Sequence, residues 1–121
     1  MFHFYVRSAL FLAIIQVIEM SLFSEIKIGN LIAKNRIALA PMTRARYGEE
    51  NLPTELNAEY FKQRSAAGFI LTDATGISKE GLGWWRAPGI WSSEQVEGWK
   101  KVTSAVHASG SIIYVQLWHM V

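Results

Sequence analysis

The sequence IALAP at residues 37–41 is a continuous apolar run that ends at a proline. Two further strand-like runs follow, FILT at residues 69–72 and IIYVQL at residues 112–117. A strand whose residues do not alternate between apolar and polar is buried on both faces, as in a parallel sheet covered by helices. The first run therefore predicts a buried strand, and the later two predict the second and third strands.

The segment between the first two strands predicts a helix over residues 54–68. Thr54 is suited to the N-cap, and Glu55 follows in the first turn, where the helix dipole favours a negative charge. Gly68 is expected to end this helix in a left-handed conformation. Its apolar face should consist of Leu56, Tyr60 and Ala67, with Phe61 as a further candidate.

A second helix is predicted from Ser92-Ser93 to Gly110. Ser92 and Gln95 have the spacing of a capping box, in which each side chain bonds to the backbone N–H of the other residue. The expected apolar stripe recurs at spacings of three, three and four, through Val96, Trp99, Val102 and Val106.

These elements follow a short hairpin, predicted because residues 25–28 alternate in polarity and Gly29-Asn30 can form a tight turn. The order after the hairpin is strand, loop, helix, strand, long loop (residues 73–91), helix, strand. This order predicts an α/β fold of parallel βα units, either a (β/α)8 barrel or a doubly wound sheet. A barrel needs about 250 residues, so the chain would hold about three of eight units and could not close.

The composition excludes several classes of protein. The 121 residues are 50% hydrophobic and 18% charged, which argues against disorder. A net charge of +2 without blocks of like charge gives no sign of a nucleic-acid partner. The absence of cysteine excludes disulfides and thiolate ligands. His3, His107 and His119 lack the spacing of metal ligands, so no metal site is expected.

Residues 1–19 differ from the rest, with the apolar run SALFLAIIQVI at residues 8–18. The run is short for a bilayer span. No small-x-small cleavage site of a signal peptide follows it. We therefore favour upstream sequence outside the fold, ahead of a natural start at Met20 of a cytoplasmic protein without a membrane partner. A signal peptide and a membrane anchor are the alternatives.

Polar groups follow each predicted strand. Thr43 comes after the first strand, Ala74-Thr75 after the second, and Gln116 lies near the end of the third. A hydroxyl, a carboxamide and the backbone groups of Pro41-Met42 and Ala74 suit the hydrogen-bonding edge of a flat heteroaromatic ring. Taken alone, each residue also fits an ordinary solvated strand end.

The decapeptide NRIALAPMTR at residues 35–44 resembles the first-strand motif of the old yellow enzyme family. Residues 59–68, residues 73–91 and QLWH at residues 116–119 resemble later family motifs in the same order and spacing. Members of this family are FMN-dependent (β/α)8 barrels. The resemblance therefore implies that residues 20–121 are the N-terminal portion of an FMN-binding TIM barrel, about three βα units plus a capping hairpin.

The resemblance implies flavin contacts at Pro41, Met42, Thr43, Ala74 and Gln116. Thr43 would hydrogen-bond a flavin carbonyl and tune the reduction potential, while Gln116 would hold the pyrimidine edge. Trp84 and Trp118 would line the substrate pocket, with packing in the core as the alternative for both. No phosphate role is expected for Arg44 and Arg46, because barrels of this kind bind phosphate near strands seven and eight.

By the same resemblance, the full enzyme would use NADH or NADPH to reduce FMN and pass a hydride to an activated alkene such as an enone. The family continues its third-strand motif as His-x-Gly-Arg, whereas here Val121 follows His119-Met120. We therefore expect a truncated sequence that lacks the family's substrate-anion ligands and its proton-donating Tyr. The alternatives are a non-catalytic product that does not bind flavin stably, or a small secreted or membrane-associated interaction module.

Overall fold

The computed structural model describes residues 21–120, so the expectations for residues 1–19 and for Val121 lie outside this part. The chain first forms the short strands β1 (Ile26–Ile28), β2 (Leu31–Ala33) and β3 (Ala38–Leu39), followed by the 3-10 helix η1 (Glu49–Asn51). It then forms the helix α2 (Glu55–Lys62), the strand β4 (Phe69–Gly76), the helix α3 (Ser93–Ala108) and the strand β5 (Ile112–Trp118).

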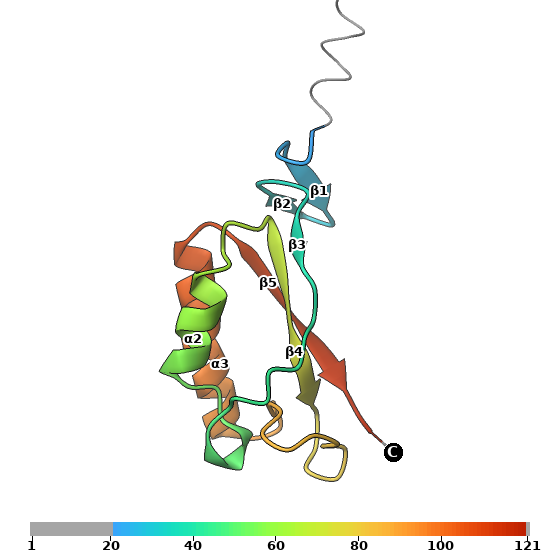
Figure 1. The fold of residues 1–121 in the computed structure, drawn as a ribbon, viewed down its shortest axis with the longest axis vertical. Helices are drawn as coiled ribbons and strands as arrows, with labels where there is room; N and C mark the ends of the chain where they lie inside the picture. Colours follow the sequence, from blue (N-terminus) through green and yellow to red (C-terminus); the bar gives the residue numbers. More distant parts are fainter. Residues whose placement is uncertain (1–20, 121) are drawn as a thin grey trace, which may run out of the picture.

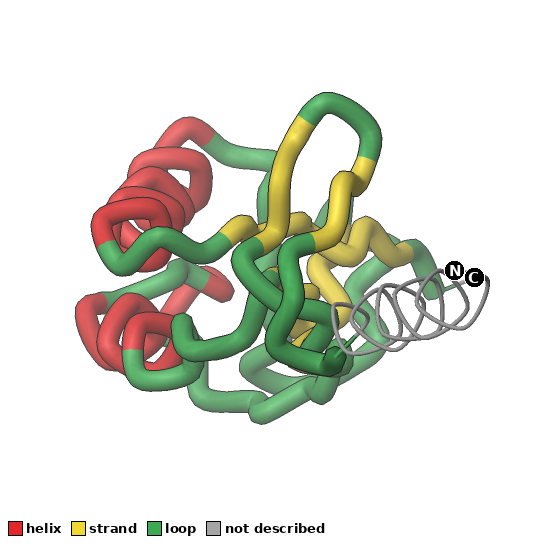
Figure 2. The backbone as a smooth tube through the Cα atoms, turned by 90° about the horizontal axis from the view of Figure 1, so that it is seen from above, coloured by secondary structure: helices red, strands yellow, loops and turns green. Residues whose placement is uncertain are grey.

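β3, β4 and β5 form a parallel sheet in sequence order, while β1 and β2 form a separate antiparallel hairpin. Figure 1 shows α2 and α3 side by side on one face of the sheet, and Figure 2 shows both helices on the same side from above. The hairpin lies at the end where β3 begins, and the long loops gather at the opposite end (Figure 1). The predicted α/β fold with parallel βα units is confirmed, and the sheet does not close into a barrel within residues 21–120.

The hydrophobic core fills the space between the two helices and the sheet. Trp99 of α3 lies at its centre, with ring centroids 5.9 Å from Tyr47 and 6.5 Å from Phe61. The indole N–H of Trp99 donates to the carbonyl of Gly89 at 3.0 Å, so its polar atom is satisfied inside the core. The buried core residues are Tyr47, Ala58, Phe61, Ile70, Trp99, Val102 and Val106.

The prediction for the first helix is wrong at its end and at part of its face, whereas Tyr60 packs against the core and Phe61 is buried in it, as expected. α2 ends at Lys62, because the following turns are held by Lys34 and Asn35, whose side chains donate to the carbonyls of Ser65 and Ala66. Leu56 is 63% exposed, and the buried residues of α2 are Asn57, Ala58 and Phe61. Gly68 is needed for a different reason than expected: a Cβ there would lie 2.0 Å from the backbone oxygen of Asn35.

The second helix largely follows the prediction. Ser92 and Gln95 form the expected capping box, and Gly110 takes the left-handed conformation with φ +71°. Three members of the predicted stripe are buried, but Val96 is exposed because Gln95 and Gly98 take the inward positions beside it. None of the helices within residues 21–120 has the length and apolar character needed to span a bilayer.

Gly68→Ala should lower the free energy of unfolding by about 3 kcal/mol, the upper end for overpacking, because its Cβ meets a backbone carbonyl that cannot rotate away. Gly110→Ala is the control, since it has open space and carries only the left-handed backbone cost of about 1 kcal/mol. Urea denaturation followed by circular dichroism measures both. Equal losses for the two variants would contradict the close approach at Gly68.

Candidate functional site

A β-bulge near the end of β4 sets which residues face the site. The register with β5 runs from Leu71↔Tyr114 to Ala74↔Gln116, so β4 holds one residue more than β5 over this interval. The hydroxyl of Thr72 accepts the backbone N–H of Gln116 at 3.1 Å and replaces the missing ladder bond. Because side chains alternate along a strand, the bulge turns Ala74 to the sheet face opposite the helices.

The bulge buries Asp73, whose residue is only 2% exposed. One carboxyl oxygen accepts the backbone N–H of Arg44 at 2.6 Å, and the other accepts the hydroxyl of Tyr47 at 3.1 Å. Burial raises the pKa of Asp73, although both hydrogen bonds and the charge of Arg44 act to lower it. Burial, with the neighbouring Asp73 carboxylate, likewise raises the pKa of Tyr47. Asp73 therefore connects the end of β4 to the loop that follows β3.

The two long loops also support each other. The side chain of Asn51 donates to the carbonyl of Ala87 at 2.7 Å, and the buried Gln95 donates to the carbonyl of Glu50 at 2.9 Å. The backbone of Gly89 donates to the carbonyl of Asn51 at 3.0 Å. These bonds fix the loop after β4 and the first turn of α3 against the loop after β3, at the carboxyl ends of the strands.

Four of the predicted site residues line one cavity of about 240 Å³, namely Thr43, Ala74, Trp84 and Trp118. Gln116 is the register partner of Ala74 and so belongs to the same edge. Pro41 and Met42 precede Thr43 but are not among the residues that line this cavity. Thr75, which follows Ala74, is buried beyond the bulge and donates to the carbonyl of Asp73.

The two tryptophans are not part of the core cluster. Trp84 is 58% exposed in the loop after β4, and Trp118 is half-buried at the end of β5. Met120 completes the lining of the cavity, with its backbone N–H bonded to the carbonyl of Gly81 at 2.9 Å. Sequence reasoning missed Met120 and Asp73, and the only signal for Asp73 was a lone carboxylate at the end of an apolar run.

Metal-binding clusters are not found in the described part of the chain. Within residues 21–120, no group of three or more His, Cys, Asp or Glu side chains could hold a metal ion. The cavity at the strand ends is lined by the hydroxyl of Thr43, the small residue Ala74, two tryptophan rings and the thioether of Met120. The carboxamide of Gln116 lies on the strand beside Ala74. Such a set offers hydrogen bonds and apolar contacts.

Asp73→Ala should lower the free energy of unfolding by about 1–3 kcal/mol for each of the two donors left without an acceptor. Asp73→Asn should cost less, because its oxygen can accept from Arg44 and its amide can donate to the Tyr47 hydroxyl. Urea denaturation at neutral pH compares the two variants. The interpretation fails if they are equally destabilised.

The same residue predicts a pH effect. The pKa of the Asp73 carboxyl group is raised in the folded chain. This group therefore keeps its proton to a higher pH there than in the unfolded chain, where it loses the proton at about pH 4. The free energy of unfolding should fall as the pH rises through the interval between these two pKa values, and then level off. Asp73→Asn should remove this decline. A difference between wild type and variant that does not change with pH would refute the raised pKa.

Comparisons with known proteins agree with this architecture. Residues 21–121 match the sequence profile of the NADH:flavin oxidoreductase / NADH oxidase family. A solved old yellow enzyme homologue from Zymomonas mobilis is 57% identical with a TM-score of 0.80, covering 83% of this chain and 28% of that one. A morphinone reductase in complex with tetrahydroNAD is 43% identical with a TM-score of 0.79, covering 82% and 27%.

Curated relatives give the same result. A flavin oxidoreductase of Emericella nidulans is 43% identical over 104 residues, which are 82% of this chain and 27% of that protein. A chanoclavine-I aldehyde reductase of Penicillium roqueforti is 44% identical over 99 residues, with 80% and 27% covered. The chain thus spans about a quarter of the length of these relatives. The resemblance found in the sequence is confirmed, and the chain belongs to the NADH:flavin oxidoreductase / NADH oxidase family of old yellow enzymes.

Proposed function

We propose that this chain forms the FMN-binding first part of a cytoplasmic flavin oxidoreductase that reduces activated alkenes, such as enones, with NADH or NADPH. Its family consists of NAD(P)H-dependent flavin oxidoreductases. The observation that carries the proposal is the gathering of Thr43, Ala74 and Gln116 at one edge of the parallel sheet. In barrel enzymes, this carboxyl edge of the strands holds the active site.

The polar groups of this edge fit the pyrimidine side of a flavin ring, where carbonyls and N–H groups alternate. Within residues 21–120, the side chains of Thr43 and Gln116 make no hydrogen bond to another residue. The hydroxyl can donate to one carbonyl, and the carboxamide can both donate and accept. FMN, when bound, supplies the hydride chemistry, and the protein's groups orient the ring and tune its reduction potential.

The proposed roles of the remaining residues follow from their surroundings. Backbone groups of Pro41, Met42 and Ala74 would contact the ring, since Ala74 carries no larger side chain to keep it away. Trp84 and Trp118 would contact the substrate, because both line the cavity beside Thr43. The substrate ligands and the proton donor implied by the family belong to its later sequence, so catalysis is proposed for the whole protein.

A chimera tests the proposal. Residues 21–120 would replace the matching first part of the Zymomonas mobilis old yellow enzyme homologue, to which they are 57% identical. We expect a yellow protein that retains FMN through gel filtration and reduces cyclohexenone with NADPH or NADH. A folded but colourless chimera would contradict the proposed flavin edge.

Variants of that chimera separate the roles of two residues. Thr43→Ala should keep FMN bound but lower its reduction potential, and flavin reduction should slow by about fivefold to tenfold, as expected for one lost hydrogen bond. Gln116→Leu should weaken FMN binding by a similar factor. Thr103→Ala on α3 and Gln63→Leu at the end of α2 are matched controls without an expected effect. Potentials unchanged by Thr43→Ala would exclude its tuning role.

One observation supports the alternative that this chain is a non-catalytic product that does not hold flavin. In the described sheet β3 and β5 are edge strands, and Tyr114, Val115 and Leu117 of β5 are exposed. Exposed apolar edges promote aggregation. Titrating the 121-residue chain with FMN distinguishes the cases: a shifted, structured flavin absorption band supports binding by this chain alone, and an unchanged spectrum supports the alternative.

A further inference from the structure

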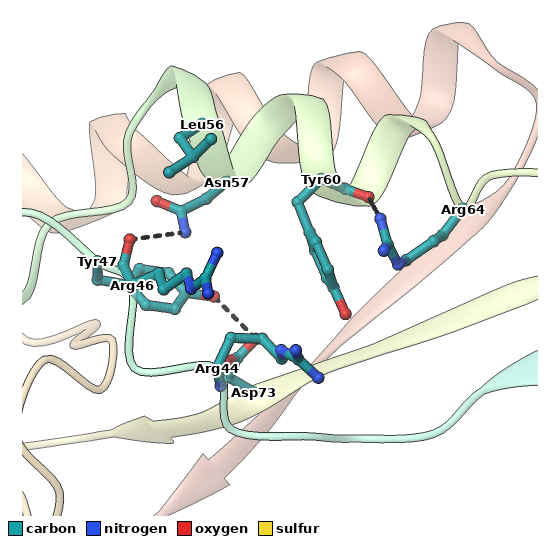
Figure 3. A pocket seen from close by; sticks show the side chains of 8 residues that line it. All are labelled: Arg44, Arg46, Tyr47, Leu56, Asn57, Tyr60, Arg64 and Asp73. Carbon is teal, nitrogen blue, oxygen red and sulfur yellow. Dashed lines mark hydrogen bonds between the residues drawn. The ribbon is translucent and has the colours of Figure 1, made fainter.

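A second cavity of about 200 Å³ lies between the loop after β3, the helix α2 and the end of β4 (Figure 3). It shares no lining residue with the cavity of Thr43 and Ala74. Arg44 directly follows Thr43, and Asp73 directly precedes Ala74. In each pair of neighbouring residues, one lines the first cavity and the other lines the second. We call this second cavity the arginine pocket, after Arg44, Arg46 and Arg64 in its lining.

The arginine pocket carries an excess of positive charge. Within residues 21–120, the salt bridges join lysines to Glu55, Glu59 and Glu97, and none involves an arginine. The only carboxyl group in the lining is Asp73, whose two oxygens already accept from Arg44 N–H and from Tyr47. Three guanidinium groups therefore share the pocket with one buried, hydrogen-bonded carboxyl group.

Tyr60 organises two of these guanidinium groups. The Arg64 guanidinium lies 3.6 Å from the centroid of the Tyr60 ring and donates to the Tyr60 carbonyl at 2.8 Å. The Arg44 guanidinium lies 6.0 Å from the same centroid. Figure 3 shows the Tyr60 hydroxyl between the side chains of Arg44 and Arg64. This hydroxyl makes no hydrogen bond within residues 21–120. Most N–H groups of these arginines are thus available to a ligand.

We propose that the arginine pocket binds a small oxyanion, a phosphate or carboxylate group, through Arg44 and Arg46 with the Tyr60 hydroxyl, while Arg64 stacks on the other side of the Tyr60 ring and adds positive charge. Planar guanidinium groups match the oxygens of such anions and bond them in pairs. The volume is below the roughly 300–1,000 Å³ typical of small-molecule sites, which suits a single anionic group. The phosphate of FMN is a different group, since barrels of this kind bind it near strands seven and eight.

Isothermal titration of the 121-residue chain with inorganic phosphate, and separately with acetate at matched ionic strength, tests the proposal. The double variant Arg44→Gln/Arg46→Gln should bind at least tenfold more weakly than wild type, since hydrogen bonds to charged groups are worth about tenfold or more each. Arg36→Gln/Arg86→Gln is the control with the same change in charge, away from the pocket. Tighter binding of phosphate identifies a phosphate group as the natural ligand, and tighter binding of acetate identifies a carboxylate.

Equal binding by all three proteins, or no binding of either anion by wild type, would overturn the proposal. Loss of fold in the double variant is monitored by circular dichroism, and Arg46→Gln alone then replaces it. The Arg46 side chain makes no hydrogen bond within residues 21–120. As an independent measurement, phosphate should protect Arg44 and Arg46 from phenylglyoxal but leave Arg36 and Arg86 reactive, as read by peptide mass spectrometry. Uniform reactivity would contradict the site.

Discussion

The buried carboxyl group of Asp73 accepts hydrogen bonds from the backbone of Arg44 and the hydroxyl of Tyr47, and it does so from within a β-bulge. β3 contains only two residues, so its own ladder fixes little of the chain that follows. The bond to Arg44 supplies that support directly after Thr43. Burying a carboxyl group costs free energy, and here the two hydrogen bonds offset part of that cost. The geometry of the candidate site depends on these two hydrogen bonds to the buried carboxyl group.

The same bulge divides the strand ends into two surfaces. On one side, Thr43, Ala74 and the tryptophans offer the neutral hydrogen-bonding and apolar groups that a flat ring requires. On the other side, Arg44 and its neighbours form a pocket of positive charge. Because alternate residues of an extended chain point in opposite directions, two short segments serve both surfaces. A change that shifts the bulge by one residue should therefore disturb both.

Local signals predicted the features whose causes are local. The capping box of Ser92 and Gln95 and the turn at Gly110 follow from residues near one another in sequence. The parallel order of the strands was predicted from the alternation of strands and helices along the chain, although the paired residues themselves are distant in sequence. The end of α2 could not be predicted in this way, because it depends on Lys34 and Asn35, each 31 residues from its partner. The Asp73 contacts span 26 and 29 residues, and the sequence pattern carried no sign of them.

The most direct test of this account measures FMN affinity in the chimera with the Zymomonas mobilis homologue, comparing wild type with Asp73→Asn and Asp73→Ala. The Asp73 side chain does not line the cavity of Thr43 and Ala74, so any effect on FMN must act through the backbone that it holds. We predict that Asp73→Asn keeps the affinity for FMN, whereas Asp73→Ala weakens it by about tenfold or more, in proportion to one or two lost hydrogen bonds. Unchanged FMN affinity and an unchanged flavin spectrum in a folded Asp73→Ala protein would contradict the account.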